Sequence, residues 1–426
     1  MVSVALLVGG CGSSAGVDSV GGASGATSGG SAQASGGSVS AASNTAGQGG
    51  AGAAPGLCKM VDGKAAYGPI GESVPWPMER VSDYSGNWGA CSLVEETLAF
   101  RAGAGYAFVW CAQVDGNSPN LFSMTVAASF EGGEPRPLLS KSSAAYLDVA
   151  SAPNGFVVTN CSSDYQPEWI FLNRELDLVA APELGAQGAS CKFKAPSVVW
   201  TGQRYLTSFT DTRGLVLASL DEQGTLIEEK VLSAEVHEPV WARFSKNGDR
   251  VLLVFRQSPM TPLRFSVLDL QGTPFAELQP FGPVLEGPSE FVISPSRDGW
   301  WVVNDSANAE RNTGLLTAIS RDGLVVPKIR DFGYLKLGAL KASPYGGSLL
   351  VASRSEGGQY AHSFALTVLI DDDGESVYST EQDFASKVGE WPLDVVADQQ
   401  RDLVVEWRAQ EGSARRTVVQ EYGCLE

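Results

Sequence analysis

The sequence predicts an all-β fold made of seven repeats of one four-stranded antiparallel unit, and three observations predict it. Seven short segments rich in β-branched and aromatic residues begin at intervals of 46 to 54 residues. Turn-forming residues bound each segment, which is typical of strands. No stretch shows a sustained apolar period of 3.6 residues, so helix should be almost absent. The seven segments are residues 105–111, 155–161, 204–210, 250–256, 299–305, 348–354 and 402–408.

The third unit displays all four strands. Its sequence predicts strands at 196–200, 204–210, 215–220 and 225–232, separated by turns that contain glycine. The fourth unit follows the same order. Four antiparallel strands in about 50 residues, repeated around a ring, are the signature of a β-propeller. Seven second strands therefore predict a seven-bladed β-propeller over residues 57–426.

The seventh unit supplies only three strands, because the strand predicted at 415–422 is followed by four residues. We expect residues 57–67 to provide the missing fourth strand, which joins the two ends of the folded part. This pairing brings Cys58 and Cys424 together, so the sequence predicts a Cys58–Cys424 disulfide. The alternative is a six-bladed ring with an irregular N-terminal extension.

The same spacing places the other four cysteines of the folded part. Cys111 and Cys161 end the second strands of their units, whereas Cys91 and Cys191 fall where first strands begin. In an antiparallel pair, the start of one strand and the end of the next lie at the same edge. We therefore expect all four thiols on one face of the disc and predict the disulfides Cys91–Cys111 and Cys161–Cys191.

The N-terminal residues predict export and a tether. Residues 1–10 are apolar but too short for a transmembrane span of about 20 residues, and they are typical of the core of a secretion signal. Residues 8–11 (Val-Gly-Gly-Cys) resemble the lipobox of bacterial lipoproteins. The resemblance implies a signal over residues 1–11, lipidation of Cys11 and an outer-membrane location. The alternative is a disordered tail in which Cys11 occurs by chance.

Residues 12–56 consist mainly of Gly, Ala and Ser, with one charged residue. Such a segment buries too little apolar area to offset its chain entropy. It is therefore predicted to be a disordered tether.

Two of the seven units resemble a known repeat. Residues 242–255 (ARFSKNGDRVLLVF), followed by 265–269 (FSVLD), resemble the SPDGKxIAF-type repeat of TolB-like propellers, and residues 291–302 are a looser match. The resemblance implies a propeller in an exported or periplasmic protein, with a role in binding a protein or a ligand.

Composition and motif searches argue against several classes of function. The formal net charge is −18, whereas a nucleic-acid-binding protein needs a basic surface. Two histidines, His237 and His362, are too few for a histidine-rich zinc site. Neither has a flanking pattern typical of a Ser–His–Asp triad, and no phosphate-loop motif occurs. The acidic run at 371–375 fits a turn between strands better than a calcium loop. We therefore expect no nucleic acid partner, no metal and no cofactor.

One set of polar residues emerges when the repeats are aligned. The position that ends each second strand should lie on one face of the disc. Arginine suits carboxylate and phosphate groups, so Arg256, Arg354 and Arg408, with Asp305, are candidate binding residues for an anionic ligand. The alternative is that they form salt bridges between blades. The residues at this position are Cys111, Cys161, Thr210, Arg256, Asp305, Arg354 and Arg408.

Trp391 is a further candidate binding residue. It lies in the last connection between blades, beside Glu390 and Pro392. Aromatic residues are enriched at binding hot spots, although tryptophans on propeller strands also pack between blades.

These observations leave three functions open. The first is a monomeric binding or scaffold module of the cell envelope, which recognises a protein or an anionic glycan and touches the membrane only through its lipid anchor. The second is a glycan hydrolase or lyase, which needs two carboxylates facing one cavity. The third is a structural envelope lipoprotein without a ligand.

Overall fold

The computed structural model places all of its strands in one compact unit, Thr45–Glu426. The predicted signal (1–11) and the whole of the predicted tether (12–56) lie outside the described residues. The structure describes residues 58–61, 64–75, 98–102, 105–112, 120–127, 136–139, 147–162, 164–184, 188–191, 195–237, 240–257, 261–282, 290–304, 314–328, 330, 332, 335–356, 362–383, 392–397, 402–409 and 415–425.

Seven four-stranded antiparallel sheets form the blades, which we number I to VII along the chain. No helix occurs in the described ranges. Blades I to III are β4 (Leu98–Ala102), β5 (Gly105–Ala112), β6 (Asn120–Ala127) and β7 (Arg136–Leu139); β8 (Asp148–Ala152), β9 (Gly155–Cys161), β10 (Pro167–Asn173) and β11 (Leu178–Ala180); and β12 (Ser197–Trp200), β13 (Tyr205–Asp211), β14 (Gly214–Leu220) and β15 (Leu226–Ser233).

The remaining blades follow the same order. Blades IV to VII are β16 (Trp241–Asn247), β17 (Arg250–Arg256), β18 (Leu263–Asp269) and β19 (Gln279–Phe281); β20 (Phe291–Ser296), β21 (Gly299–Asn304), β22 (Leu315–Ser320) and β23 (Val325–Lys328); β24 (Leu335–Ala342), β25 (Ser348–Glu356), β26 (His362–Ile370) and β27 (Ser376–Asp383); and β28 (Pro392–Ala397), β29 (Asp402–Ala409), β30 (Arg415–Cys424) and β3 (Tyr67–Pro75).

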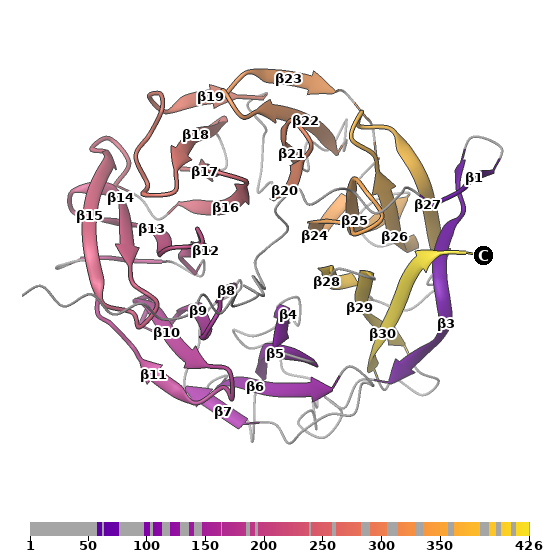
Figure 1. Cartoon of the computed structure of the whole chain (residues 1–426), viewed down its shortest axis with the longest axis horizontal. Helices are drawn as coiled ribbons and strands as arrows, with labels where there is room; N and C mark the ends of the chain where they lie inside the picture. Colours follow the sequence, from indigo (N-terminus) through magenta and orange to yellow (C-terminus); the bar gives the residue numbers. More distant parts are fainter. Residues whose placement is uncertain are drawn as a thin grey trace, which may run out of the picture. The chain divides into compact units, whose positions relative to one another are not determined.

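The blades close into a ring through their first strands (Figure 1). Each first strand contacts the first strand of the next blade, and β28 of blade VII contacts β4 of blade I. The prediction of seven blades is confirmed, and the six-bladed alternative is wrong.

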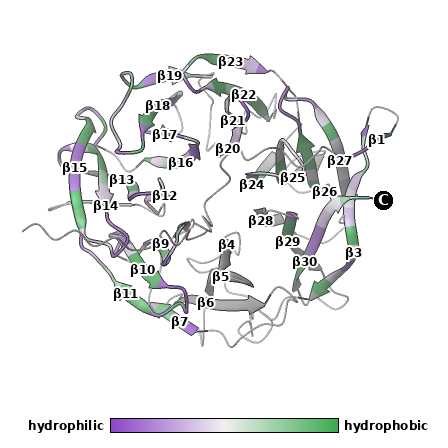
Figure 2. Ribbon diagram, viewed as in Figure 1, coloured by the Kyte–Doolittle hydropathy of each residue, from purple (hydrophilic) through white to green (hydrophobic). Residues whose placement is uncertain are grey.

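The hydrophobic core lies between neighbouring blades. Leu206 and Leu217 of blade III, for example, pack with Val251 and Phe255 of blade IV. The second strands are buried on both faces: every residue of Gly155–Cys161 and of Gly299–Asn304 is buried. Because these strands are buried on both faces, they appear as continuous apolar runs in the sequence. Hydrophobic residues recur from blade to blade around the ring (Figure 2).

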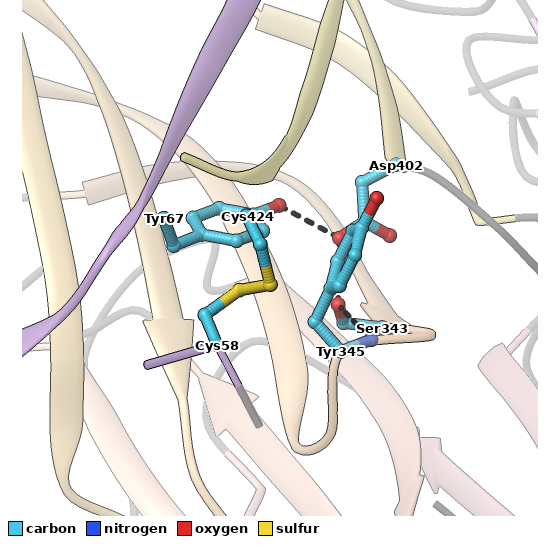
Figure 3. The surroundings of a disulfide bond; sticks show 6 residues. All are labelled: Cys58, Tyr67, Ser343, Tyr345, Asp402 and Cys424. Atoms are coloured by element: carbon cyan, nitrogen blue, oxygen red, sulfur yellow. Dashed lines mark hydrogen bonds between the residues drawn. A yellow bond between two sulfur atoms is a disulfide. The ribbon is translucent and has the colours of Figure 1, made fainter. Parts of the chain in front are cut away.

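Blade VII combines the two ends of the folded part. β3 pairs antiparallel with β30, and Tyr67 lies opposite Cys424. The Cys58–Cys424 disulfide is present (Figure 3). The predicted position of the donated strand, 57–67, is wrong, because the strand that pairs is Tyr67–Pro75. β1 (Met60–Val61) and β2 (Lys64–Ala65) instead pair antiparallel with each other, and the strand that completes blade VII begins after them.

Candidate functional site

The ring has two faces with different connections. The turn face holds the ends of the first and third strands, and most of its turns are short: residues 153–154 join β8 to β9, and 297–298 join β20 to β21. The loop face holds the ends of the second and fourth strands. Its connections include 305–314 between β21 and β22 and 76–97 between β3 and β4. Because long connections carry most binding residues, the loop face is the candidate functional face.

A polar cluster lies where the first strands of blades II, III and IV begin on the loop face. The Ser197 hydroxyl and the Val198 N–H both donate to Asp148 Oδ2, over 2.7 and 3.1 Å. The Arg243 guanidinium lies 3.8 Å from Asp148 Oδ1, and the Phe244 N–H donates to Ser197 Oγ over 3.1 Å. Asp148 and Ser197 thus link three consecutive blades.

The cluster keeps contact with solvent. The side chains of Asp148 and Arg243 are 19% and 24% exposed. A guanidinium has five N–H donors, and its separation from Asp148 is longer than a hydrogen bond. Arg243 can therefore also bind a carboxylate or phosphate group of a partner.

Sequence reasoning missed this cluster, although a signal existed. Asp148, Ser197 and Arg243 each lie seven residues before the start of the second-strand segment of their unit, at 155, 204 and 250. Val292 occupies the same position before the segment at 299. The aligned second strands carry no information on this position, which lies in the first strands.

Arg256 lies where it was predicted, at the loop-face end of β17, and it is only 5% exposed. Its backbone pairs with Trp241, and its Nε donates to the carbonyl of Thr261 over 3.1 Å. The guanidinium thus helps to hold the connection between β17 and β18. This burial favours the structural interpretation of Arg256 over direct ligand contact.

The other candidate binding residues are described only in part. Arg354 and Arg408 lie near the loop-face ends of β25 and β29, where their backbones pair with Phe364 and Arg416. The structure describes the backbones of these two arginines but not their side chains. Asp305 and Trp391 lie outside the described residues, since β21 ends at Asn304 and β28 begins at Pro392.

A disulfide braces the loop face at blade II. Cys161, the last residue of β9, is bonded to Cys191 as predicted. The N–H of Cys191 donates to the carbonyl of Tyr165, and the N–H of Ser190 donates to that of Thr210 in blade III. The bridge therefore fixes the connection between blades II and III. The predicted partner of Cys111, Cys91, lies outside the described residues, so the Cys91–Cys111 disulfide stays a prediction.

Further ionisable groups form polar contacts in blades II and III. Glu168, the second residue of β10, accepts a hydrogen bond from Asn160 Nδ2 over 2.6 Å. Burial raises the pKa of Glu168, and the hydrogen bond partly offsets that rise. In blade III, the buried Asp211 accepts from the Arg213 guanidinium, which also contacts Glu229; these hydrogen bonds raise the pKa of Arg213.

The two histidines and the acidic run at 371–375 lie in loops, strands or turns. His237 is exposed, and His362 begins β26. The acidic run is a turn, as predicted: Asp371 Oδ1 accepts from the N–H groups of Asp373 and Glu375. Within the described part of the chain, no group of His, Cys, Asp and Glu is arranged to hold a metal ion. In the same ranges, no helix has the length and apolarity to cross a membrane.

Comparison with known proteins finds no matching family model and no matching curated protein. Among solved structures, the Dos1 propeller has 11% identity and a TM-score of 0.45, and the match covers 85% of this chain and 97% of that one. A structure from a study of two prolyl endopeptidases has 10% identity and a TM-score of 0.44 (82% and 54% covered).

The propeller domain of the Trilobed protease from Pyrococcus furiosus has 10% identity and a TM-score of 0.44 (76% and 95% covered). These likenesses are distant and say nothing of what this chain binds. The fold follows from the chain's own seven four-stranded sheets and their closed ring of first strands. The folded part of this protein is a seven-bladed β-propeller.

Proposed function

We propose that this protein is an exported, lipid-anchored binding or scaffold module, which recognises a protein or an anionic glycan on the loop face of its propeller. The observation that carries the proposal is the difference between the faces. Long connections and the Asp148–Arg243 cluster lie on the loop face, whereas short turns close the turn face.

Contacts between the turns of neighbouring blades support this assignment. Asn154 of blade II donates through its Nδ2 to Glu222 of blade III over 2.9 Å. Arg297 of blade V pairs with Asp372 of blade VI over 2.8 Å. The polar groups of these turns are engaged within the ring, so a polar ligand finds better partners on the loop face.

The disulfides support export. Two are present, Cys58–Cys424 and Cys161–Cys191. Disulfides form and persist in oxidising compartments such as the bacterial periplasm and the cell exterior. Lipidation of Cys11 and an outer-membrane location belong to the proposal and rest on the sequence of the leader.

A ligand screen tests the proposal. The full chain, produced in an oxidising compartment, is presented to a panel of acidic and neutral glycans and envelope proteins, and every hit is checked for product. Arg243→Gln is the first variant, because Arg243 is partly exposed. The triple variant Arg256→Ala, Arg354→Ala, Arg408→Ala tests the three arginines that lie near the loop-face ends of second strands. Arg321→Ala, on the turn face, is the matched control.

The outcomes separate the three functions. Binding without turnover that Arg243→Gln or the triple variant weakens, and Arg321→Ala does not, supports recognition by the loop face. Turnover of a glycan contradicts the binding module and favours the hydrolase or lyase. Absence of binding across the panel contradicts the proposal and favours a structural lipoprotein. Circular dichroism of each variant distinguishes lost binding from lost fold.

A further inference from the structure

The turn face carries a belt of acidic turns around its outer edge. Five connections, each of which joins a third strand to a fourth strand in blades II to VI, contain ten carboxylates, two arginines and no lysine. The fourth strands that follow them, from β11 to β27, lie at the outside of the ring (Figure 1). We call these five connections the acidic belt. They are residues 174–177, 221–225, 270–278, 321–324 and 371–375.

The acidic belt is continuous from blade to blade. In blades III to VI, a glycine of each turn lies against side chains of the preceding blade; these glycines are Gly224, Gly272, Gly323 and Gly374. Gly272, for example, lies so near Leu217 of blade III that a Cβ would be 2.8 Å from that side chain. The five turns therefore form one surface that a single partner can cover.

Arginines neutralise only part of the negative charge of the belt. Three of its carboxylates pair with arginines that lie outside it, in the pairs Arg136–Asp177, Arg297–Asp372 and Arg330–Glu375. The belt's own Arg321 pairs with Asp249, which lies outside the belt. Within the described part of the chain, the other seven carboxylates of the belt form no ion pair.

Several of these seven carboxylates are accessible to a partner. Glu175, Glu277 and Asp322 are exposed, and no other described residue donates a hydrogen bond to their side chains. In the turn of blade VI, Asp373 is exposed beside Asp371. Burial raises the pKa of Asp371, and the neighbouring carboxylates raise it further. A cationic group bound at this turn reduces the repulsion between these carboxylates.

Exposed hydrophobic side chains accompany the acidic turns. In each of blades II to V, a large apolar side chain that lies in the belt or directly after it is at least 45% exposed. These residues are Leu178, Leu226, Phe275 and Leu324. Exposed apolar groups gathered in one region mark interaction sites. A metal cation or a polyamine leaves such side chains uncovered, so the belt fits a larger partner.

The charge of the belt decides between the candidate partners. Anionic lipid headgroups and nucleic acids are repelled, since they carry charge of the same sign. A second copy of this chain, with a formal net charge of −18, is repelled as well. A basic polypeptide matches both features of the belt, because Lys and Arg combine an apolar stem with a charged end. Arg250 already lies over the ring of Phe275, 3.6 Å from its centroid, so a guanidinium suits this side chain.

We propose that the acidic belt docks a basic segment of a protein partner, in which Lys or Arg residues are interspersed with apolar residues. The exposed carboxylates bind the cationic ends, and the exposed apolar side chains of blades II to V cover the apolar residues of the segment. This inference goes beyond the proposed function, because it assigns a second binding surface on the opposite face of the ring, and it does not depend on a ligand of the loop face.

Three labelled peptides of equal length are the probes. The first consists of Lys and Leu, the second has Ser in place of Leu, and the third has Glu in place of Lys. Fluorescence anisotropy measures the affinity of each peptide for the full chain. The chain carries Cys11→Ser, so that no lipid at this position contributes to binding.

Two variants and one control locate the binding surface. The acid variant adds Glu175→Gln, Glu277→Gln and Asp322→Asn. The matched control removes three exposed carboxylates from the connections of the loop face, by Glu183→Gln, Glu235→Gln and Asp164→Asn. The apolar variant adds Leu178→Ser, Leu226→Ser and Leu324→Ser. Thermal unfolding checks that all three fold like the parent.

The parent chain should bind the Lys–Leu peptide about tenfold more tightly than the Lys–Ser peptide, and it should not bind the Glu–Leu peptide. The acid variant should bind the Lys–Leu peptide about tenfold more weakly, whereas the loop-face control stays within about twofold of the parent. The apolar variant should lose about tenfold in affinity for the Lys–Leu peptide and less than about twofold for the Lys–Ser peptide.

Other results overturn the proposal. Absence of Lys–Leu binding contradicts it directly, and equal losses in the acid variant and the loop-face control show that only the overall charge of the chain attracts the peptide. Equal affinity for the Lys–Leu and Lys–Ser peptides shows a surface for any polycation, and equal affinity for the Glu–Leu peptide shows a purely apolar one. The comparison of the three peptides uses the parent chain and is independent of the folding of any variant.

Discussion

Blades III and VII have the same four strands but are assembled from different parts of the chain. Blade III is one continuous stretch, in which the turn 221–225 joins β14 to β15. Asp221 Oδ1 accepts from the N–H groups of Gln223 and Thr225, and Gly224 adopts a φ of +86°. Blade VII instead pairs β30 with β3, and the Cys58–Cys424 disulfide bridges a sequence separation of 366 residues.

The disulfide lies where the other blades have a turn. In blade III, Gly224 packs on Phe171 of blade II, so closely that a Cβ would lie 2.8 Å from that ring. In blade VII, Gly423 packs on Tyr345 of blade VI, where a Cβ would lie 2.5 Å from the hydroxyl oxygen. At both junctions, a glycine packs against a side chain of the preceding blade. In blade VII, a covalent bond between the chain ends thus takes the place of the local turn found in blade III.

Blade VII also has a polar contact that supports its junction (Figure 3). The Tyr67 hydroxyl donates to Asp402 Oδ2 over 2.7 Å, and the Ser343 hydroxyl of blade VI donates to the same oxygen over 2.6 Å. The ring of Tyr67 meets that of Tyr378 edge to face. These contacts join β3 to two blades at once.

The largest expected effect comes from removing the junction disulfide. Cys58→Ser with Cys424→Ser should lower the free energy of unfolding by about 5 kcal/mol, because the bond closes a very long loop. Chemical denaturation measures the change. The double variant Cys161→Ser, Cys191→Ser is the control: its loop has a sequence separation of 30 residues, so its loss should be smaller, about 3 kcal/mol. Equal losses would contradict the special role of blade VII.

Tyr67→Phe tests the polar contact of blade VII and should have the next largest effect. It removes one donor from the buried carboxylate of Asp402, and a hydrogen bond to a charged group is worth about 2 to 3 kcal/mol. Urea denaturation of Tyr67→Phe against the wild type measures this loss. The matched control is Tyr378→Phe, which removes a hydroxyl from the ring that packs on Tyr67. A loss as large in that variant would show that removing any tyrosine hydroxyl from this aromatic cluster has the same effect, and that the Asp402 contact is not special.

Tyr67 also predicts a dependence on pH. Burial, and then the Asp402 carboxylate, raise the pKa of Tyr67 far above its ordinary value of 10.0. The folded protein therefore keeps this proton while the unfolded chain loses it above pH about 10. Stability should be fully present below that pH and fall as the pH rises through it. Denaturation of wild type and Tyr67→Phe between neutral and alkaline pH measures this, and an unchanged slope in the variant would contradict it.

Gly224→Ala tests the turn of blade III. The new Cβ meets Phe171 at 2.8 Å and requires a positive φ, so we expect a loss of about 1 to 2 kcal/mol. Gly71→Ala is the matched control, since Gly71 has a φ of +67° and nothing within 4 Å of a Cβ. Thermal unfolding of both variants compares them, and a larger loss in the control would show that packing against blade II contributes little.

Glu222→Ala should have the smallest effect. Its carboxylate binds Asn154 of blade II at the exposed edge of the turn face. Exposed polar contacts of this kind are worth less than about 0.5 kcal/mol. A loss above that value in chemical denaturation would show that polar contacts between turns, rather than the packing of Gly224, hold blade III to blade II.

Most of the ring could be predicted from the sequence, because the second strands are buried on both faces and therefore stand out as apolar runs at regular intervals. Residues 250–256 were predicted as a strand and form β17. The donated strand was misplaced, since no apolar pattern distinguishes residues 57–67 from Tyr67–Pro75. Sequence spacing placed Arg256 at the end of its strand but carried no information on whether its side chain is buried.

The candidate site was harder to predict for a physical reason. Asp148, Ser197 and Arg243 meet only because the ring brings the first strands of three blades together. Their common position in the repeat was visible, but their hydrogen bonds depend on the closure of the ring.

We infer that closure of the ring depends on blade VII, the junction that Cys58–Cys424 joins. Hydrogen exchange of the native protein, followed by mass spectrometry, compares the amides of β3 and β30 with those of β14 and β15. In the wild type, we predict similar protection for both pairs. In Cys58→Ser, Cys424→Ser, β3 and β30 should lose protection while β14 and β15 keep theirs, because local opening exposes only the junction. Unchanged protection of β3 in this variant would contradict the claim.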